Sequence, residues 1–280
     1  MINLFPDKSA LSPSQLKIAD FIERYPEEML FMTEQEIADR LGMSIATVSR
    51  FWRAVGYDNA KAFKLKLRNA SDITPALKLE NTMSRMDASS LPLVMLEQVM
   101  EHLQTTAEKT RPDEVEQAAG IIAGARRLYV YAPGPSLSLG DLIAYRLSRF
   151  GISVRMMAGS GHELLESLVN LEKRDAVLVF SFTRMLPETE VILDCASRVG
   201  CPALMITDRE DLRYGTSAEV SFCVSRGDMG EFHSMVTPLL LVEQLILSIG
   251  LMSREEVLNK LDYLGELRAR YADKLPRGKV

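Results

Sequence analysis

The segment from Thr33 to Gly56 constrains the fold of this chain more than any other, because it carries the start and stop signals of two short helices. Thr33, followed three residues later by Glu36, forms a capping box in which the first turn satisfies its own amides. Gly42 follows the last apolar residue of the first helix, where a left-handed backbone ends the helix and glycine adopts it without strain. Ser44 then caps the second helix. The segment predicts two helices joined by a tight turn.

Apolar residues recur at helical spacing on one side of each predicted helix. They are Ile37, Ala38 and Leu41 in the first helix and Val48, Phe51 and Val55 in the second. With these residues inward, the second helix turns short polar side chains and arginines outward, namely Ser44, Ala46, Thr47, Ser49, Arg50 and Arg53. Such side chains reach base edges and phosphates from a helix in the major groove. We expect them to contact double-stranded DNA; the alternative is a generic helical hairpin from an unrelated bundle.

The distribution of charge favours the DNA-binding interpretation. The chain as a whole is acidic, with 33 Lys+Arg against 38 Asp+Glu and a net charge of -5, but residues 40–68 are basic. The basic residues there are Arg40, Arg50, Arg53, Lys61, Lys64, Lys66 and Arg68, and the single acidic residue is Asp58. A basic island in an acidic chain is typical of local phosphate binding. Lys61 and Lys64 therefore join the expected DNA contacts, although lysines also simply solvate exposed helix faces.

Length and composition allow a buried core and two domains, since the chain has 280 residues of which 47% are hydrophobic. Cys195, Cys201 and Cys223 lack C-x-x-C spacing, which predicts reduced, buried thiols rather than disulfides or a zinc site. The N-terminus lacks a signal-peptide pattern, and the longest apolar segment, 236–252, is too short to span a bilayer. We expect a soluble, cytoplasmic protein with no membrane partner, metal or cofactor.

From residue 126 onward, short apolar runs alternate with amphipathic segments. The runs that predict strands are 128–132, 152–158, 176–182, 203–207 and 220–224, and the segments that predict helices are 136–150, 161–171, 187–199 and 235–250. Strands that are apolar along nearly their whole length and alternate with helices form a parallel sheet covered on both faces. The prediction is a three-layer α/β/α domain.

The chain therefore combines an α part with an α/β part. We expect an all-helical helix-turn-helix domain over 1–75, a linker and connecting helix over 76–111, the α/β domain over 112–252, and a C-terminal helix and tail over 253–280. Proteins with this DNA-binding element usually read two half-sites, so their symmetry is two-fold. The apolar helices at 93–103 and 235–250 offer surface for a homodimer or homotetramer.

Parallel sheets bind ligands beyond the carboxyl ends of their strands, close to helix N-termini. Three predicted loops at such positions, 132–136, 159–163 and 181–188, carry candidate groups, which are Gly134, Ser136, His162, Ser181, Thr183, Arg184 and Glu188. Glycine permits close backbone approach, hydroxyls donate, and arginine is permanently charged. We expect a small anion, a phosphate ester or carboxylate, to bind there, against the alternative of ordinary turn and capping chemistry in each loop.

Both halves resemble the RpiR/MurR family of bacterial transcriptional regulators, over nearly the whole chain. In the first half the resemblance rests on Ala38-Asp-Arg-Leu-Gly42, Ser44-Ile-Ala-Thr-Val-Ser-Arg50 and Gly56-Tyr57 running to Phe63-Lys64. In the second half it rests on Gly134-Pro-Ser136, Ala144-Tyr-Arg-Leu-Ser-Arg-Phe-Gly151, His162, Asp175-Ala-Val-Leu-Val-Phe-Ser181, Thr207-Asp208 and Ser217-Ala218-Glu219. The resemblance implies a sugar isomerase (SIS) domain that senses a sugar phosphate, and control of genes of carbohydrate metabolism.

By that resemblance, Ser136, Ser181 and Thr183 fall where the family contacts phosphate. The family loop reads Ser, any residue, Ser-Gly, any residue, Thr, whereas here Arg184 replaces the glycine and Leu186 the threonine. One hydroxyl is lost and a guanidinium is gained, which favours a sugar acid or another unusual sugar derivative as the effector, or a pocket that no longer senses.

An alternative function is a SIS-type sugar-phosphate isomerase with an appended helical domain. Isomerisation of a sugar requires a base beside the reacting carbons. His162, Glu163 and Glu188 are the candidate bases in this sequence. A third option, a pure oligomerisation scaffold, does not account for the basic helix.

Overall fold

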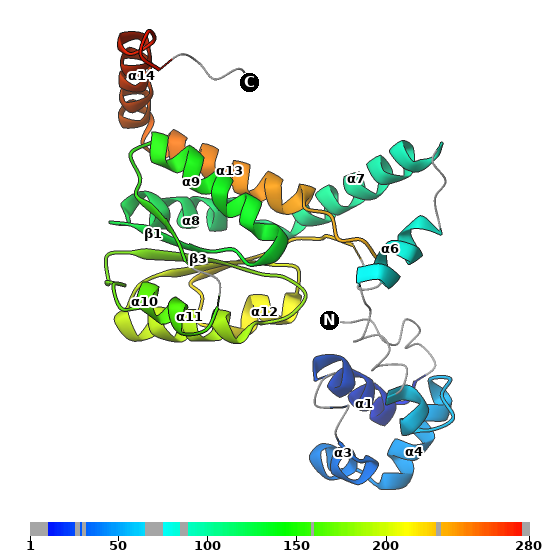
Figure 1. The fold of residues 1–280 in the computed structure, drawn as a ribbon. Helices are drawn as coiled ribbons and strands as arrows, with labels where there is room; N and C mark the ends of the chain where they lie inside the picture. Colours follow the sequence, from blue (N-terminus) through cyan, green and yellow to red (C-terminus); the bar gives the residue numbers. More distant parts are fainter. Residues whose placement is uncertain are drawn as a thin grey trace. The chain divides into compact units, whose positions relative to one another are not determined.

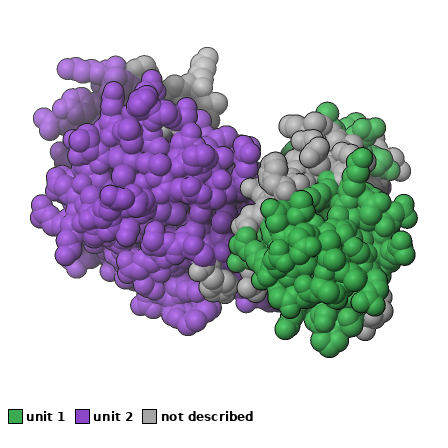
Figure 2. Space-filling model, turned by 90° about the horizontal axis from the view of Figure 1, so that it is seen from below, with its two compact units in different colours: residues 1–88, 228–232 green, residues 89–227, 233–280 purple. Residues whose placement is uncertain are grey.

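The computed structural model describes residues 11–25, 29, 32–64, 75–84, 89–157, 160–227 and 231–275. Lys66, Arg68 and Gly159 of the segments discussed above lie outside these residues. The chain forms two compact units, coloured green and purple in Figure 2: residues 1–88 with 228–232, and residues 89–227 with 233–280. The four-part division expected from the sequence stays a prediction.

The first unit contains helices α1 (Pro13–Arg24), α3 (Glu34–Leu41), α4 (Ile45–Ala54) and α6 (Pro75–Met83). The local signals read from the sequence act as expected. Glu36 donates its N–H to the Thr33 hydroxyl at 3.2 Å, and the Glu36 carboxylate accepts the Thr33 N–H at 2.6 Å. The Thr33 N–H and, at 2.9 Å, the Thr33 hydroxyl both donate to the Glu36 carboxylate and lower its pKa, the backbone bond more strongly. Gly42 ends α3 with a φ of 63°, and Ser44 accepts the Thr47 N–H at 3.2 Å.

Aromatic side chains form the centre of the first unit's core. Trp52 is fully buried and stacks on Phe63, with ring centroids 5.1 Å apart, and Phe51 meets Trp52 edge-on. Ala38 is fully buried where α3 and α4 pack together, as its place in the apolar stripe of the first helix predicted. Val55 was expected in the buried stripe of the second helix but is only half-buried, because α4 ends at Ala54 and Val55 lies beyond its last turn.

The second unit is a five-stranded parallel sheet covered by helices (Figure 1). Its strands are β1 (Leu128–Tyr131), β2 (Val154–Met156), β3 (Ala176–Ser181), β4 (Ala203–Thr207) and β5 (Val220–Cys223), in the order β2-β1-β3-β4-β5. Its helices are α7 (Leu91–Lys109), α8 (Pro112–Gly124), the 3-10 turn η1 (Gly134–Ser136), α9 (Leu137–Arg149), α10 (His162–Leu168), α11 (Pro187–Val199), α12 (Glu210–Gly215), α13 (Val236–Met252) and α14 (Arg254–Arg270).

Alternate residues of each central strand enter two separate cores, one on each face of the sheet. Leu178, Phe180 and Ile206 pack with α8, α9 and α13, whereas Val179 and Met205 pack with α10 and α11. Figure 1 shows the same three layers, with α8, α9 and α13 above the sheet and α10, α11 and α12 below it. The predicted three-layer α/β/α architecture is confirmed.

Some elements differ from the sequence-based expectation. Strand β2 is shorter than the predicted 152–158, and α12 lies in a segment for which the sequence pattern predicted no helix.

Cys201 and Cys223 are buried free thiols as expected, and burial raises the pKa of each to about 12. Cys195 is half-buried. Helices α13 and α14 join at a bend of 100°; no single helix among the described residues is long and apolar enough to cross a membrane.

An ion pair with a buried carboxylate fixes the turn that leads into β3. Both carboxylate oxygens of Asp175 accept from Arg126 at 2.8 Å, and one also accepts the Glu172 N–H at 2.9 Å. Burial raises the pKa of the Asp175 carboxyl, but these hydrogen bonds outweigh it and the pKa lies below its ordinary value of 3.8. The pair therefore stabilises the fold above pH 3.8, and that contribution is lost as the pH falls through the lowered pKa.

We predict that Asp175→Asn lowers the free energy of unfolding by about 3 kcal/mol at pH 7, since it breaks a pair whose carboxylate is buried while Arg126 stays partly exposed. Urea unfolding followed by circular dichroism measures the loss. The difference between variant and wild type should narrow below pH 3.8. As a control, Asp194→Asn breaks an exposed pair with Arg198 and should cost less than about 1 kcal/mol. Equal losses in the two variants would contradict the prediction.

Candidate DNA and effector sites

Helix α4 presents its polar residues to solvent as the sequence predicts. Ser44, Ala46, Ser49, Arg50 and Arg53 are exposed and Thr47 is half-buried. Ala46, Arg50 and Arg53 follow one another at helical spacing, and the Arg50 Nε donates to the Ala46 carbonyl at 3.1 Å. The guanidinium of Arg50 is therefore held against its own helix rather than against another element.

Two expected DNA contacts are partly engaged inside the domain. The Ser49 hydroxyl donates to Glu34 of α3, which ties the two helices together. Lys64 is half-buried and donates to the Met32 carbonyl, whereas Lys61 is exposed. Lysine carries its charge on a long flexible stem, and here that stem turns toward the loop before α3. The sequence pattern did not distinguish the two lysines, whereas in the structure Lys61 is exposed and Lys64 is engaged within the domain.

Ile45 is a further candidate for DNA contact that the sequence analysis did not select. This first residue of α4 is 45% exposed although it is large and apolar. Apolar side chains at the start of a major-groove helix contact thymine methyl groups. The signal was present in the sequence, because Ile45 directly follows the cap Ser44 and precedes the inward-facing Val48.

The loop after β1 leads through η1 into α9. Gly134 has a φ of 60°, which favours glycine, and Ser136 is 1% exposed. The Ser136 hydroxyl donates to the Pro133 carbonyl at 2.6 Å. Both predicted residues thus lie at the carboxyl end of β1, and the serine is turned into the protein.

The loop after β3 is a tight turn. The Arg184 N–H donates to the Phe182 carbonyl at 2.7 Å, and Thr183 between them has a φ of 68°. A β-branched residue at positive φ is strained, by about 1–2 kcal/mol. The Ser181 hydroxyl, 1% exposed, donates to the Arg184 carbonyl at 3.3 Å, while Arg184 itself is exposed. The structure therefore gathers Ser181, Thr183 and Arg184 in one turn.

A carboxylate from the end of β4 holds this turn. Asp208 accepts the Thr183 N–H at 2.6 Å through one oxygen and the Arg226 guanidinium at 3.0 Å through the other. Arg226 follows β5, is 6% exposed, lies 4.1 Å over the Phe182 ring and donates to the Ser234 carbonyl at 3.0 Å. Burial lowers the pKa of Arg226, and the negative charge of Asp208 opposes that shift without cancelling it.

Arg209 adds a further cation beside the turn. It donates to the Thr183 carbonyl at 3.1 Å and pairs with Asp211 at 2.9 Å. Asp208, Arg209 and Arg226 were not among the predicted site residues. They could have been predicted as Ser181 was, because ligands bind beyond the carboxyl ends of parallel strands and each of the three residues follows such an end.

The remaining predicted residues are distributed differently. Glu188 is half-buried in the first turn of α11. The pKa of Tyr131, at the end of β1, is raised mainly by burial of the tyrosine itself and further by the negative charge of Glu188. His162 is exposed at the start of α10 and, among the described residues, forms no hydrogen bond to another predicted site residue. The hydroxyl of Thr189, one residue after Glu188, is fully buried and has no hydrogen-bond partner within the described part of the chain.

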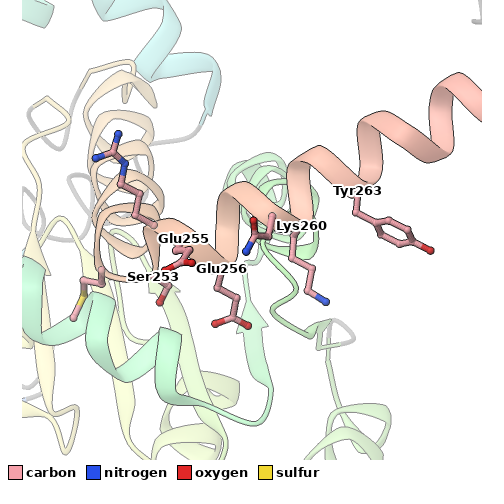
Figure 3. Close-up of a pocket in the computed structure, with 8 residues that line it drawn as sticks. Ser253, Glu255, Glu256, Lys260 and Tyr263 are labelled. Atoms are coloured by element: carbon pink, nitrogen blue, oxygen red, sulfur yellow. The ribbon is translucent and has the colours of Figure 1, made fainter.

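A surface pocket of about 730 Å³ lies elsewhere, at the bend between α13 and α14. Figure 3 shows the side chains of Glu256, Lys260 and Tyr263 projecting outward from α14 along it. Acidic and basic groups alternate on one open helix face there, so this pocket lacks the convergent donors that an anion requires. The described residues also contain no cluster of three His, Cys, Asp or Glu suited to a metal ion.

Family models match both units. A model for the helix-turn-helix domain of the rpiR family matches residues 3–72, and a model for the SIS domain matches residues 121–270, more than half of the chain. The chain belongs to the SIS family and carries an rpiR-type helix-turn-helix domain. The predicted resemblance is thereby confirmed for both halves.

Among curated relatives, a "Bifunctional protein glk" of Burkholderia orbicola is 26% identical over 257 residues, which are 90% of this chain and 39% of that protein. The chain thus spans well under half the length of that relative. An uncharacterized HTH-type transcriptional regulator, YfhH of Escherichia coli, is 25% identical over 70% of this chain and 71% of its own. Among solved structures, the NanR protein of Vibrio vulnificus complexed with ManNAc-6P matches with a TM-score of 0.59 and 22% identity, covering 93% and 94% of the two chains. That likeness shows the fold.

Proposed function

We propose that this protein is a transcriptional regulator in which the SIS domain binds a small anionic sugar derivative and thereby modulates operator binding by the rpiR-type domain. One observation carries the proposal: the exposed face of α4 with Arg50 and Arg53 belongs to the same chain as the turn that gathers Ser181, Thr183 and Arg184 at the strand ends. The regulator relative and the ligand of the NanR structure support it. The regulated genes would serve carbohydrate metabolism.

In this proposal, α4 is the recognition helix. Arg50 pairs with a base edge, Arg53 and Lys61 contact phosphates, and Ser44, Ala46, Thr47, Ser49 and Ile45 lie against the groove. Lys64, which holds the Met32 carbonyl, supports the domain and contacts DNA less directly.

We predict that Arg50→Ala costs about 1–3 kcal/mol of specific operator binding, because a guanidinium bidentate to guanine supplies discrimination of that size. Fluorescence anisotropy with the DNA upstream of the protein's own gene measures the loss. Arg198→Ala removes an equal charge from exposed α11 in the other unit and should leave binding unchanged. Unchanged affinity in both Arg50→Ala and Arg53→Ala, with the fold intact, would remove α4 from the reading role.

The effector in this proposal is a sugar phosphate or a sugar acid. The ManNAc-6P bound by the NanR structure makes an N-acetylhexosamine 6-phosphate the first compound to test. The guanidinium of Arg184, which stands where the family has glycine, extends the choice to carboxylated sugars because it pairs bidentately with either anion.

We predict that Arg184→Ala weakens effector binding more than Ser181→Ala does. Charge-assisted hydrogen bonds are roughly twice as strong as neutral ones, and the Ser181 hydroxyl is already turned toward the Arg184 carbonyl. Titration calorimetry with a panel of sugar phosphates and sugar acids compares the two variants. Operator affinity without effector should stay unchanged in both, since an empty pocket supplies no differential contacts. Equal losses of affinity in the two variants would show that Arg184 does not bind the effector. If no anion binds to the wild type, the pocket no longer senses an effector.

The alternative of an isomerase gains one observation, the half-buried Glu188 whose charge reaches Tyr131 at a strand end. A carboxylate in such a place is a candidate base. The two functions separate in one assay, because an isomerase converts the sugar phosphate that a regulator releases unchanged.

A regulator that reads a two-fold operator is expected to be a dimer or a pair of dimers. Helix α13 supplies a suitable surface: Leu240, Leu247 and Leu251 recur along one side of it and are 37%, 66% and 75% exposed. Exposed apolar stripes of this kind mark interaction surfaces. Helix α7 carries a second such set, with Leu93, Leu96 and Met100 exposed.

We predict that the protein sediments as a dimer or larger assembly at micromolar concentration and that Leu247→Glu shifts it toward monomer, because the substitution buries a charge in the contact. Val191→Glu places the same charge on an exposed position of α11, in the opposite layer, and should leave the assembly intact. A wild-type protein that is monomeric with and without DNA would contradict the prediction.

A further inference from the structure

We infer that Asp208 is an internal substitute for the effector anion, which keeps the 181–184 turn closed until an effector displaces it. This inference rests on the proposed function, since it concerns the same anion site. It assigns to Asp208 the role of a gate that sets effector affinity, a role distinct from contact with the effector.

The first support is the state of the backbone donors in the turn. An anion at the end of a parallel strand is held mainly by backbone N–H groups and nearby hydroxyls. Here the Thr183 N–H is bonded to Asp208, and the Arg184 N–H is bonded to the Phe182 carbonyl. The hydroxyls of Ser136 and Ser181 are bonded to backbone carbonyls and are each 1% exposed. The backbone donors of Thr183 and Arg184 and the two buried serine hydroxyls are therefore occupied from within.

The second support is the chemistry of the occupant. A carboxylate is itself an oxyanion, and its bond to the Thr183 N–H is short, at 2.6 Å, as charge-assisted bonds are. An effector phosphate or carboxylate entering this turn competes with Asp208 for the same donor and meets a like charge beside it. Binding thus requires that the Asp208 oxygen leave Thr183.

The third support is the strain in the closed turn. Thr183 has a φ of 68°, a conformation that β-branched residues rarely adopt and that persists only when the surroundings impose it. Asp208 accepts the Thr183 N–H, and the Arg209 guanidinium donates to the Thr183 carbonyl. These two hydrogen bonds hold Thr183 at positive φ. Opening of the turn relieves this strain, which favours exchange of Asp208 for an external anion.

Arg226 explains why Asp208 stays in place without an effector. The buried guanidinium binds the second carboxylate oxygen at 3.0 Å and is fixed by the Phe182 ring and the Ser234 carbonyl. Arg226 is a positioning residue, and it also leaves a cation next to the turn once Asp208 has moved away.

Asp208→Asn tests the gate. Asparagine keeps the shape and one oxygen acceptor but removes the negative charge, so N-acetylmannosamine 6-phosphate and inorganic phosphate should bind about tenfold tighter than to the wild type, by titration calorimetry. Glu210→Gln removes the same charge two residues away, from a side chain that pairs with Lys109 and lies on α12. It should change the affinity less than twofold. Equal affinity in Asp208→Asn and wild type, or equal tightening in both variants, overturns the gate.

A pair of substitutions at Thr183 tests the gate without altering any charge. Thr183→Gly and Thr183→Ala both remove the hydroxyl, but only glycine adopts the positive φ without strain and so favours the closed turn. The glycine variant should bind the two probes about threefold to tenfold more weakly than the alanine variant. Equal affinities, or tighter binding by the glycine variant, overturn the gate even if Asp208→Asn does not fold.

The outcomes also separate this inference from the proposed function. If the wild type binds neither probe while Asp208→Asn binds them, the gate is supported and the question of effector identity stays with the proposed function. If the wild type binds a probe and none of the substitutions changes the affinity as stated, the proposed function stands and the gate is wrong. If neither the wild type nor Asp208→Asn binds, removal of the carboxylate has uncovered no site, and the gate is again wrong.

Discussion

The parallel register of the sheet is the constraint on which the rest of the second unit depends. Because β1, β3, β4 and β5 all run in one direction, Ser181 pairs with Thr207 and Thr207 with Cys223, and the residues after each strand emerge at one edge. That edge collects groups from positions far apart in the chain, among them Ser136, Thr183 and Asp208. Because helices cover both faces, the central strands β1, β3 and β4 are buried along their whole length and nearly all their residues are apolar, so polar groups gather at the strand ends.

Much of the fold could be predicted from sequence because its signals are local. The capping box at Thr33, the left-handed Gly42 and the cap Ser44 act within four residues of themselves, and each has the predicted geometry. The strands were recognisable as short apolar runs between amphipathic segments. Helix α12 was not predicted because its six residues are too few to show a helical period, and Leu212 is the only large aliphatic residue among them.

The site was harder to predict because its decisive contacts join separate strands. The residues around Thr183 in the sequence do not predict a positive φ there, because the hydrogen bonds that hold it come from Asp208, 25 residues further on, and from Arg209. Lys64 likewise bonds a carbonyl 32 residues away, so helical periodicity could not show that it turns inward. A third long-range bond lies in the first unit, where Phe232 donates its N–H to the Thr82 hydroxyl of α6, 150 residues earlier in the chain.

The three cysteines differ in a way that matters for labelling. Because burial raises the pKa of Cys201 and Cys223 to about 12, their thiols stay protonated at pH 7, and alkylating reagents and peroxides attack them very slowly. Cys195 is half-buried on α11, the helix that directly follows the 181–186 loop. A maleimide dye should therefore attach first at Cys195, which would give the native sequence a built-in reporter position on the helix that follows the 181–184 turn.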